Sequence, residues 1–540
     1  MTIFDRESLA HGVIAEGSTM TPLSRRTFLA AALASGILST LPASESVASE
    51  TEKRLVAGTR TLEVNGRAAR VYSLIGPDGR PGIRLRSRER FRVDLANQSG
   101  KPTLVHWHGQ SPPWMQDGFP WSETTPLANG AVQSYDYTPI RGTYWMHSHY
   151  GMQEQVLMTA PLIIEDEATR REDRQEIVLL LHDFTFRSPE EVFARLTHAD
   201  GRGTRAVVQR AGDSSGRAVR AQHAAMTGMG MAGTDMRGMN MTGMDMAGMM
   251  NMSGHGAAVM QTSGAAAPPM DLNDVDYDAF LANDRTLADP EVVRVERGGR
   301  IRLRIINGAS SSQFWIDLGA LTGNVVAVDG HPVRPVTSQR FPIAMAQRFD
   351  LLIDLPSSGA FPVLAQLEGS PRRTGIILAT RGSNITRVAD RSPIAPPVDL
   401  SLETRLAAAE PLHARPADLV RTISLGGSMH PYSWSMNGER WPHITPLMVK
   451  QGQRVEFELV NRTMMAHPMH LHGHAFQVVA IDGRPLQGAV RDTVLVMPGT
   501  GRVRIAFDAD NPGRWAFHCH NLYHMQSGMM TEVRYDGIAA

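Results

Sequence analysis

LRSRERFRVDLAN (residues 85–97), VERGGRIRLRIIN (295–307) and VKQGQRVEFELVN (449–461) align with one another without a gap. Each copy has an arginine at its sixth position, then three apolar residues that alternate with polar ones, and an asparagine at its end. Alternation with a period of two predicts a strand with one buried face. Because the three copies are far apart in the chain, they predict three similar all-β sandwich domains rather than a solenoid.

Length and composition limit the class of protein. A chain of 540 residues is too long for a single core, which agrees with several domains. Lys+Arg and Asp+Glu are both 54, and this balance argues against the basic face of a nucleic-acid-binding protein. Cys519 is the only cysteine, so no disulfide can form within the chain, and the thiol must be free, reactive or bound to metal.

The first 48 residues have the pattern of an export signal. The paired arginines of SRRTFL (24–29) lead into an apolar run over 28–41, and a small-x-small cleavage site follows at 46–48. The arginine pair is typical of the twin-arginine route. The alternative is a membrane anchor, but the run is shorter than the roughly 20 residues that a span needs. We therefore expect a periplasmic mature protein without a membrane span, from a bacterium.

Histidine pairs stand at equivalent places in the first and third copies of the repeat. His106 and His108 follow Asn97 by nine and eleven residues, and His470 and His472 follow Asn461 by the same intervals. In the middle copy these positions are Ile316 and Leu318.

A second match extends this pattern. GTYWMHSH (142–149) aligns with GRWAFHCH (513–520), which adds two more His-x-His pairs. Random placement of 20 histidines in 540 residues gives only about 0.7 such pairs, whereas the chain has five. Four matched pairs predict a metal cluster where the first and third domains meet. The fifth pair ends at His474, for which we expect a structural or supporting role; lone histidines such as His182 are expected to be ordinary packed residues.

The segment HCHNLYHMQSGM (518–529) suggests a second metal. On a strand, His518 and His520 face one side and Cys519 faces the other, so the thiolate would bind a separate metal joined to the cluster through one backbone. Thiolate, two imidazoles and a distant thioether form the blue-copper ligand set. Candidates for the other three ligands are His467, His524 and Met529. A closed zinc site or a cysteine nucleophile would leave the other histidines unexplained.

HWHG (106–109), HSH (147–149), HPMHLH (467–472) and HCHNLYHMQSGM (518–529) resemble the four signature motifs of the three-domain multicopper oxidases, the laccase family. The resemblance implies three cupredoxin-like sandwiches and four copper ions, one of type 1, one of type 2 and two of type 3. It implies that the oxidase passes single electrons from type 1 copper through Cys519 to His518 and His520, where dioxygen is reduced to water. The implied ligands are His467, Cys519, His524 and Met529 for type 1, His106 and His470 for type 2, and His108, His147, His149, His472, His518 and His520 for the type 3 pair.

Proton delivery depends on acids beside the cluster. Asp117 stands where members of this family have a proton donor, although an aspartate before Gly118 is equally typical of a turn. Some members also carry a carboxylate directly after the last type 1 histidine, where this chain has Met525. A second proton route is therefore in doubt.

A methionine-rich tract interrupts the middle of the chain. It contains eleven of the 30 methionines among glycines and small polar residues, a composition that predicts a disordered insertion. Thioethers select Cu(I), so we interpret the tract as a collector of cuprous ions; a plain disordered loop is the alternative. Its methionines are Met226, Met229, Met231, Met236, Met239, Met241, Met244, Met246, Met249, Met250 and Met252.

Together with the export signal, the tract is similar to that of the bacterial copper-resistance oxidases of the CopA type. This resemblance implies oxidation of Cu(I) to Cu(II) in copper tolerance, with two alternatives: a laccase-like oxidase of phenols and aromatic amines, or a periplasmic protein that sequesters copper. The expected partners are dioxygen and either Cu(I) or a small reducing substrate, and we expect a monomer. The expected domains are a signal peptide (1–48), a first cupredoxin domain (52–168), a second (174–400, with the insert at about 221–260) and a third (415–540).

Overall fold

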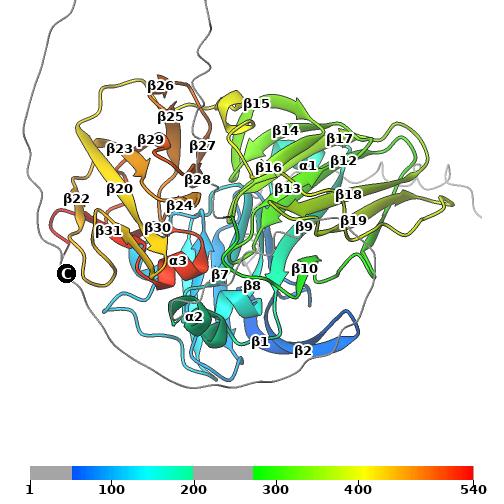
Figure 1. Ribbon diagram of the computed structural model, residues 1–540, viewed down its shortest axis with the longest axis horizontal. Helices are drawn as coiled ribbons and strands as arrows, with labels where there is room; N and C mark the ends of the chain where they lie inside the picture. The colour runs from blue at the N-terminus through cyan, green and yellow to red at the C-terminus, as the bar shows by residue number, and fades with distance from the viewer. Residues whose placement is uncertain (1–51, 199–271, 539–540) are drawn as a thin grey trace, which may run out of the picture. The chain divides into compact units, whose positions relative to one another are not determined.

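The computed structural model describes residues 52–198 and 272–538 (Figure 1). The predicted export signal and the methionine-rich tract lie outside these residues. Within them, strands dominate and helices are few and short.

The first sandwich, blue to cyan in Figure 1, has two four-stranded sheets. In spatial order, one sheet is β2 (Arg67–Ile75), β1 (Lys53–Val64), β4 (Phe91–Asn97) and β6 (Val132–Tyr137). The other is β3 (Ile83–Leu85), β8 (Thr159–Ile164), β7 (Gly142–Ser148) and β5 (Val105–His108). Apolar side chains from both sheets, such as Phe91 and Trp107, form its core.

The second sandwich, largely green in Figure 1, pairs a six-stranded sheet with a five-stranded one. The larger is β10 (Ala279–Ala282), β9 (Gln175–Phe184), β12 (Arg300–Asn307), β17 (Arg348–Asp354), β14 (Gly323–Val328) and β15 (His331–Ser338). The smaller is β11 (Val292–Val295), β19 (Arg373–Thr380), β18 (Ala360–Leu367), β13 (Phe314–Asp317) and β16 (Arg340–Ile343).

The third sandwich, yellow to red in Figure 1, pairs a seven-stranded sheet with a five-stranded one. The first is β21 (Tyr432–Met436), β20 (Leu419–Met429), β23 (Arg454–Asn461), β29 (Arg502–Asp508), β25 (Phe476–Ile481) and β26 (Arg484–Pro485), with β27 (Val490–Arg491) also paired to β25. The second is β22 (Leu447–Val449), β31 (Met530–Tyr535), β30 (Arg514–Cys519), β24 (His467–Leu471) and β28 (Thr493–Val496).

The three repeated segments form equivalent strands. β4, β12 and β23 each lie inside a sheet, parallel to one neighbour (β1, β9 and β20) and antiparallel to the other (β6, β17 and β29). The apolar residues predicted for the buried face of each strand are buried in the structure. One local pattern therefore produces the same strand environment three times.

The asparagine that ends each repeat has a structural explanation. The side chains of Asn97, Asn307 and Asn461 are fully buried, and each oxygen accepts the main-chain N–H two residues later, at 3.0, 3.2 and 2.9 Å. Each amide nitrogen donates to two main-chain carbonyls. Asparagine satisfies these buried groups because it has both an acceptor and donors in one side chain.

The helices are α1 (Glu167–Arg171), α2 (Pro189–Thr197) and α3 (Leu522–Gln526), and there are 3-10 turns at Trp114–Gln116, Gln153–Val156 and Glu403–Arg405. Ser188 and Glu191 form a capping box at the start of α2. None of the helices in residues 52–198 and 272–538 has the length and hydropathy to cross a bilayer.

The predicted fold class, all-β with three cupredoxin-like sandwiches, is confirmed. The strands of the three sandwiches run from Lys53 to Ile164, from Gln175 to Thr380 and from Leu419 to Tyr535. The domain limits themselves stay predictions.

Candidate metal centre

Strand register brings the four matched histidine pairs together two by two. In the first sandwich β5 pairs antiparallel with β7, which sets His106 opposite His147. In the third, β24 pairs antiparallel with β30, which sets His470 opposite His518. Because side chains on a strand alternate between faces, the second histidine of each pair points to the same side as the first.

Eight buried histidines converge between the first and third sandwiches and form a cluster. Their closest contacts each join one sandwich to the other or lie within the third. The Nε2 atoms of His106 and His470 are 3.5 Å apart, and those of His147 and His520 are 3.4 Å apart. The Nε2 atoms of His472 and His518 are 3.0 Å apart. Possible ligand atoms lie within 4.8 Å of one another in the groups His106–His470–His472, His108–His147–His520 and His149–His472–His518.

Asp117 touches a histidine from each of the two sandwiches. Its Oδ2 lies 2.7 Å from Nδ1 of His472, and its main-chain oxygen lies 2.9 Å from Nδ1 of His106. The carboxyl group is fully buried. Gly118 adopts a φ of +81°, and a Cβ there would come within 1.9 Å of the Val105 oxygen, so the turn that the sequence suggested is also present.

Two further carboxylates contact histidines of the cluster. Oδ1 of Asp492 lies 3.0 Å from Nε2 of His108, and its main-chain oxygen lies 2.9 Å from Nδ1 of His470. Oε2 of Glu154 lies 2.7 Å from Nδ1 of His147. Such partners orient a histidine ring and fix which nitrogen carries the proton, which leaves the other nitrogen for a metal.

Burial favours the neutral form of several cluster histidines by lowering their pKa. Burial, together with neighbouring imidazoles, lowers the pKa of His147, His149, His472 and His520 well below the usual 6.5. The pKa of His518 falls to about 3 for the same reasons. A neutral imidazole has a lone pair to offer a metal ion, whereas an imidazolium has none.

Cys519 lies in a separate buried group with His467 and His524. Its Sγ is 3.6 Å from Nδ1 of each histidine, and the two Nδ1 atoms are 3.1 Å apart. The Cys519 N–H donates to the main-chain oxygen of Met529 at 3.1 Å, and the Met529 side chain is also buried. Cys519 therefore belongs to one group while its neighbours His518 and His520 belong to the cluster.

Polar side chains also contact the two histidines beside Cys519. Nε2 of His467 is 2.7 Å from Oγ1 of Thr463, and Nε2 of His524 is 3.0 Å from Oδ2 of Asp274. Asp274 also accepts hydrogen bonds from Tyr432 and Asn521, each at 2.9 Å. Although burial raises the pKa of Asp274, His524 and these two donors hold it below its usual value.

Sequence reasoning did not find Glu154, Asp274, Thr463 or Asp492. None of the four belongs to a motif that the sequence analysis recognised; Asp274 is one of four aspartates in DLNDVDYD (271–278), which gives no sign that it alone contacts a histidine. One available signal was the pair Arg491 and Asp492: they interrupt a largely apolar segment, AVRDTVLVM (489–497), and charges in such a place need buried partners.

The donor groups fit copper. Within the described residues, His108 Nδ1 and His149 Nε2 are buried and lack a hydrogen-bond partner, as expected of atoms kept for a metal ion. Imidazole suits copper, and the thiolate with two imidazoles suits a blue-copper centre. Burial raises the pKa of the Cys519 thiol, so a bound cation would be needed to hold it as the thiolate.

The remaining predicted residues have other surroundings. His474 is 2.7 Å from the Tyr535 hydroxyl and 3.1 Å from the His472 oxygen, in agreement with a structural role. His182 contacts Oγ1 of Thr159 at 2.6 Å. Met525 packs in an apolar cluster with Phe119 and Trp121. The eleven methionines of the tract lie outside the described residues.

Known proteins provide an independent comparison. Three family models, each described as multicopper oxidase, match residues 62–169, 236–386 and 415–537. The chain is 30% identical to the multicopper oxidase MmcO of Mycobacterium tuberculosis over 95% of this chain and 96% of that protein. It is 28% identical to a copper resistance protein A homolog of Pseudomonas syringae pv. tomato, over 95% and 99% of the two chains.

Among solved structures, Fet3p, described as a multicopper oxidase that functions in iron import, has a TM-score of 0.67 at 18% identity and covers 89% of this chain and 90% of its own. That likeness concerns the fold. The matched family models and the full-length relatives agree with the geometry of the two histidine groups, and the resemblance predicted from the motifs is confirmed. The chain belongs to the multicopper oxidase family, the copper-dependent oxidases that use dioxygen.

Proposed function

We propose that this oxidase converts Cu(I) to Cu(II) in copper tolerance and uses dioxygen as the electron acceptor. The observation that carries the proposal is the convergence of ten buried histidines and one cysteine into two neighbouring groups linked by β30. A protein that only stored copper would have no need for the eight-histidine cluster.

The proposed ligands follow the sets that the contacts define. His467, Cys519, His524 and Met529 would hold type 1 copper. His106 and His470, whose Nε2 atoms are 3.5 Å apart, would hold type 2 copper. The type 3 pair would be held by two sets of three histidines, His108 with His147 and His520, and His149 with His472 and His518. This assignment gives four coppers per chain.

Bound in these sites, copper would supply the oxidation of four Cu(I) ions to Cu(II), one electron at a time, and the reduction of one dioxygen with four protons to two waters. The chain's own contribution is the path between the sites. Cys519 is covalently continuous with His518 and His520, so only a few bonds of β30 separate the two groups of ligands. Burial of both groups excludes water from this path.

Asp117 is the proposed general acid. Its carboxyl group is buried 2.7 Å from Nδ1 of His472, so a proton held there lies next to the cluster. Met525 occupies the position where some family members have a second acid, and it packs in an apolar cluster, so it supplies no second acid.

Two observations favour Cu(I) as the substrate. The tract carries eleven methionines between Met226 and Met252, and thioethers are soft ligands that select Cu(I). The described chain resumes at 272, and Asp274 lies 3.0 Å from His524, a proposed type 1 ligand. The described chain that follows the tract in sequence thus begins close to the proposed entry point for electrons. Relatives named copper resistance protein A support the proposed part in copper tolerance.

The proposed location is the periplasm, reached by the twin-arginine route. The arginine pair of SRRTFL and the apolar run over 28–41 support this proposal. Replacement of both arginines by lysine should leave the protein in the cytoplasm, as cell fractionation would show.

Oxygen uptake by copper-loaded protein tests the substrate. We would measure it with Cu(I) and with a phenol, in the full chain, in a variant lacking 226–252, and in a control whose eleven methionines are replaced by serine at unchanged length. We expect both variants to keep their blue colour and their rate with the phenol, and to lose most of their rate with Cu(I).

Two other outcomes would overturn the proposal. Retention of the rate with Cu(I) as well as the rate with the phenol would favour a laccase-like oxidase of phenols or aromatic amines, with the tract incidental. Uptake of many copper ions without oxygen consumption would favour sequestration.

A further inference from the structure

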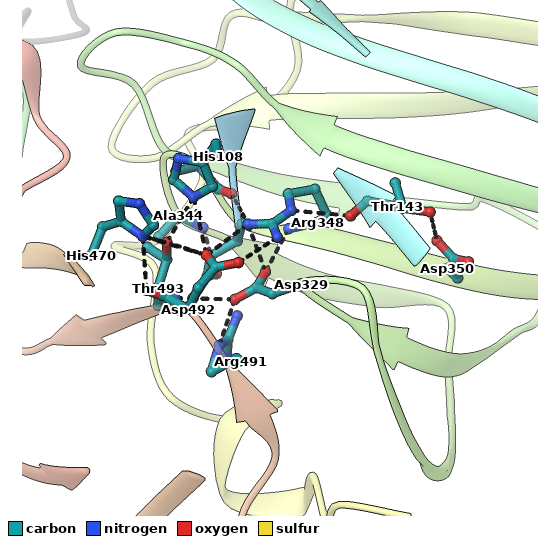
Figure 2. A network of polar contacts seen from close by, with 12 residues as sticks. His108, Thr143, Asp329, Ala344, Arg348, Asp350, His470, Arg491, Asp492 and Thr493 are labelled. Atoms are coloured by element: carbon teal, nitrogen blue, oxygen red, sulfur yellow. Dashed lines mark hydrogen bonds and ion pairs between the residues drawn. The ribbon is translucent and has the colours of Figure 1, made fainter. Parts of the chain in front are cut away.

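The middle sandwich has apolar residues where the other two have ligand histidines, yet it reaches the cluster through a buried polar network. Arg348, the first residue of β17, is fully buried and extends toward the junction of all three sandwiches. Figure 2 shows its guanidinium between Asp492, His108 and Asp329. A buried guanidinium is costly unless all its donors are paired.

All three nitrogens of the Arg348 guanidinium have partners. Nη1 and Nη2 donate to the two carboxylate oxygens of Asp492 at 2.8 and 2.5 Å, a bidentate pair between the middle and third sandwiches. Nη1 also donates to the Ala346 oxygen at 3.0 Å, and Nε donates to the Thr143 oxygen of β7 at 3.3 Å. One side chain therefore joins the three sandwiches, since Thr143 belongs to the first.

Asp492, which Arg348 holds in place, contacts two histidines of the cluster. A carboxylate only accepts, so the contact between its Oδ1 and Nε2 of His108 at 3.0 Å requires the proton on Nε2. His108 Nδ1, which lacks a hydrogen-bond partner among the described residues, is then the nitrogen with a free lone pair. The main-chain oxygen of Asp492 similarly accepts a hydrogen bond from Nδ1–H of His470 at 2.9 Å.

The middle sandwich also fixes Arg348 and the strand of Asp492. Oδ1 of Asp329 accepts the Arg348 main-chain N–H at 2.9 Å, and Oδ2 accepts Nε of Arg491 at 3.0 Å. The same Oδ2 accepts the main-chain N–H of Thr493 at 3.3 Å. Asp492 is thus held through its side chain by Arg348 and through both sequence neighbours by Asp329.

Gly109, directly after His108, shows how closely these parts fit. It has a φ of +82°, and a Cβ there would lie 2.5 Å from Oδ2 of Asp492 and 2.7 Å from Nη2 of Arg348. Only glycine allows the ion pair to pack against this turn.

We propose that Arg348 is a positioning residue for the histidine cluster: acting through Asp492, it fixes the ring orientation of His108 and the main chain that holds His470. The middle sandwich thereby completes a copper site to which it gives no ligand. The inference rests on the proposed copper ligands of the cluster.

The test compares copper retention in four variants. R348M removes the guanidinium, R348K keeps the charge without the bidentate fork, D492N weakens the acceptor, and the double variant R348M/D492N asks whether Arg348 acts through Asp492. Each purified, copper-loaded protein is challenged with a chelator. The type 2 signal in electron paramagnetic resonance then reports the cluster, and the blue absorption reports the Cys519 site.

We expect R348M and D492N to lower the copper affinity of the cluster about ten- to a hundredfold, the usual effect of losing a residue that orients a ligand. R348K should be intermediate, and the double variant should be no worse than D492N. The blue absorption should persist in all four, because Arg348 and Asp492 contact none of Cys519, His467 and His524 in the contacts described above.

Arg304 provides a matched control. It is equally buried, lies in the same sheet, and also reaches the first sandwich, through Oγ1 of Thr143 at 2.8 Å; its carboxylate partners are Asp350 and Glu176 instead of Asp492. R304M should therefore retain cluster copper better than R348M.

Three results would overturn the inference: unchanged cluster retention in R348M, equal losses in R348M and R304M, or losses from R348M and D492N that add in the double variant. If R348M does not fold, R348K decides the question by the same criteria. Failure of the wild-type chain to bind cluster copper would instead refute the proposed function.

Discussion

The first and third sandwiches contain the same four-residue pocket with different chemistry. Thr103 and His467 both lie six residues after the asparagine of the repeat, and Ser148 occupies the place of Cys519. Gln153 then stands at the place of His524, and Met158 at that of Met529. The backbone agrees as well: Ser148 N–H donates to the Met158 oxygen at 3.0 Å, as Cys519 N–H does to Met529 at 3.1 Å.

In the first sandwich this pocket closes on itself. Oε1 of Gln153 accepts the hydroxyls of Thr103 and Ser148 at 2.8 and 2.7 Å. In the third sandwich the corresponding atoms are Sγ of Cys519 and Nδ1 of His467 and His524. They lie close together, but none of them accepts two hydroxyl hydrogen bonds as Oε1 of Gln153 does. The comparison shows that the fold forms this pocket twice. The three side chains that differ decide whether the pocket contains hydrogen-bonded polar groups or a set of possible metal ligands.

The largest expected effect comes from giving the third sandwich the serine of the first. C519S should abolish the blue absorption and reduce oxidase activity to background, because the thiolate and the path through it are both lost. Absorption spectra and oxygen uptake measure these losses. Cluster copper, measured by the type 2 signal, should remain; a blue C519S protein would contradict the assignment.

The reverse exchange should add a site. In T103H/S148C/Q153H the first sandwich would carry all the side chains of the other pocket, with Met158 already in place, so we expect blue absorption per chain to rise toward twice the wild-type value. Metal analysis should show additional copper. S148C alone is the control and should add none. A folded triple variant without extra blue absorption would show that the backbone match is not sufficient.

Acid should destabilise the copper-free protein through its histidines. Burial lowers the pKa of His147, His149 and His467 well below 6.5 and that of His518 to about 3, so the unfolded state binds more protons as pH falls. The contribution of each such histidine to the free energy of unfolding is therefore fully present above about pH 6.5. Below that pH it falls by about 1.4 kcal/mol per pH unit until the folded-state pKa is reached.

Urea unfolding of the copper-free chain between pH 7.5 and 5 would measure this slope. The variant H467T/C519S/H524Q, which copies the hydrogen-bonded pocket of the first sandwich, should have a shallower slope because His467 is gone. An unfolding free energy that does not change over this range would contradict the expectation.

The smallest effect is expected in the hydrogen-bonded pocket itself. S148A removes the hydroxyl that bonds Gln153 and accepts the Tyr150 N–H at 3.0 Å, which should cost about 1–3 kcal/mol of unfolding free energy. Urea unfolding measures it. A change within experimental error would mean that water replaces the hydroxyl and that the pocket is looser than its contacts suggest.

Much of the site was accessible from the sequence because strands have a simple period. Alternation fixed which side chains share a face, and equal spacing after Asn97 and Asn461 placed the ligand pairs of two domains in register. Ile316 shows the same logic in reverse, since it is buried opposite Ala365 where the other sandwiches pair two histidines.

The residues behind the ligands were not accessible in this way. Asp492 and Asp274 act across sequence separations that no local pattern records; Asp274 and His524, for example, are 250 positions apart in the chain and 3.0 Å apart in space. Their roles arise only when packed sandwiches bring their surfaces together. The domain limits and the copper assignment itself remain predictions.

The turn at Gly109 has a consequence for how the HWHG motif is understood. Its two histidines are proposed metal ligands, whereas its glycine is required by the packing between domains. A methyl group on Gly109 would overlap the ion pair between Arg348 and Asp492, which come from the two other sandwiches. A chain could thus keep every ligand and still lose the site through one added carbon.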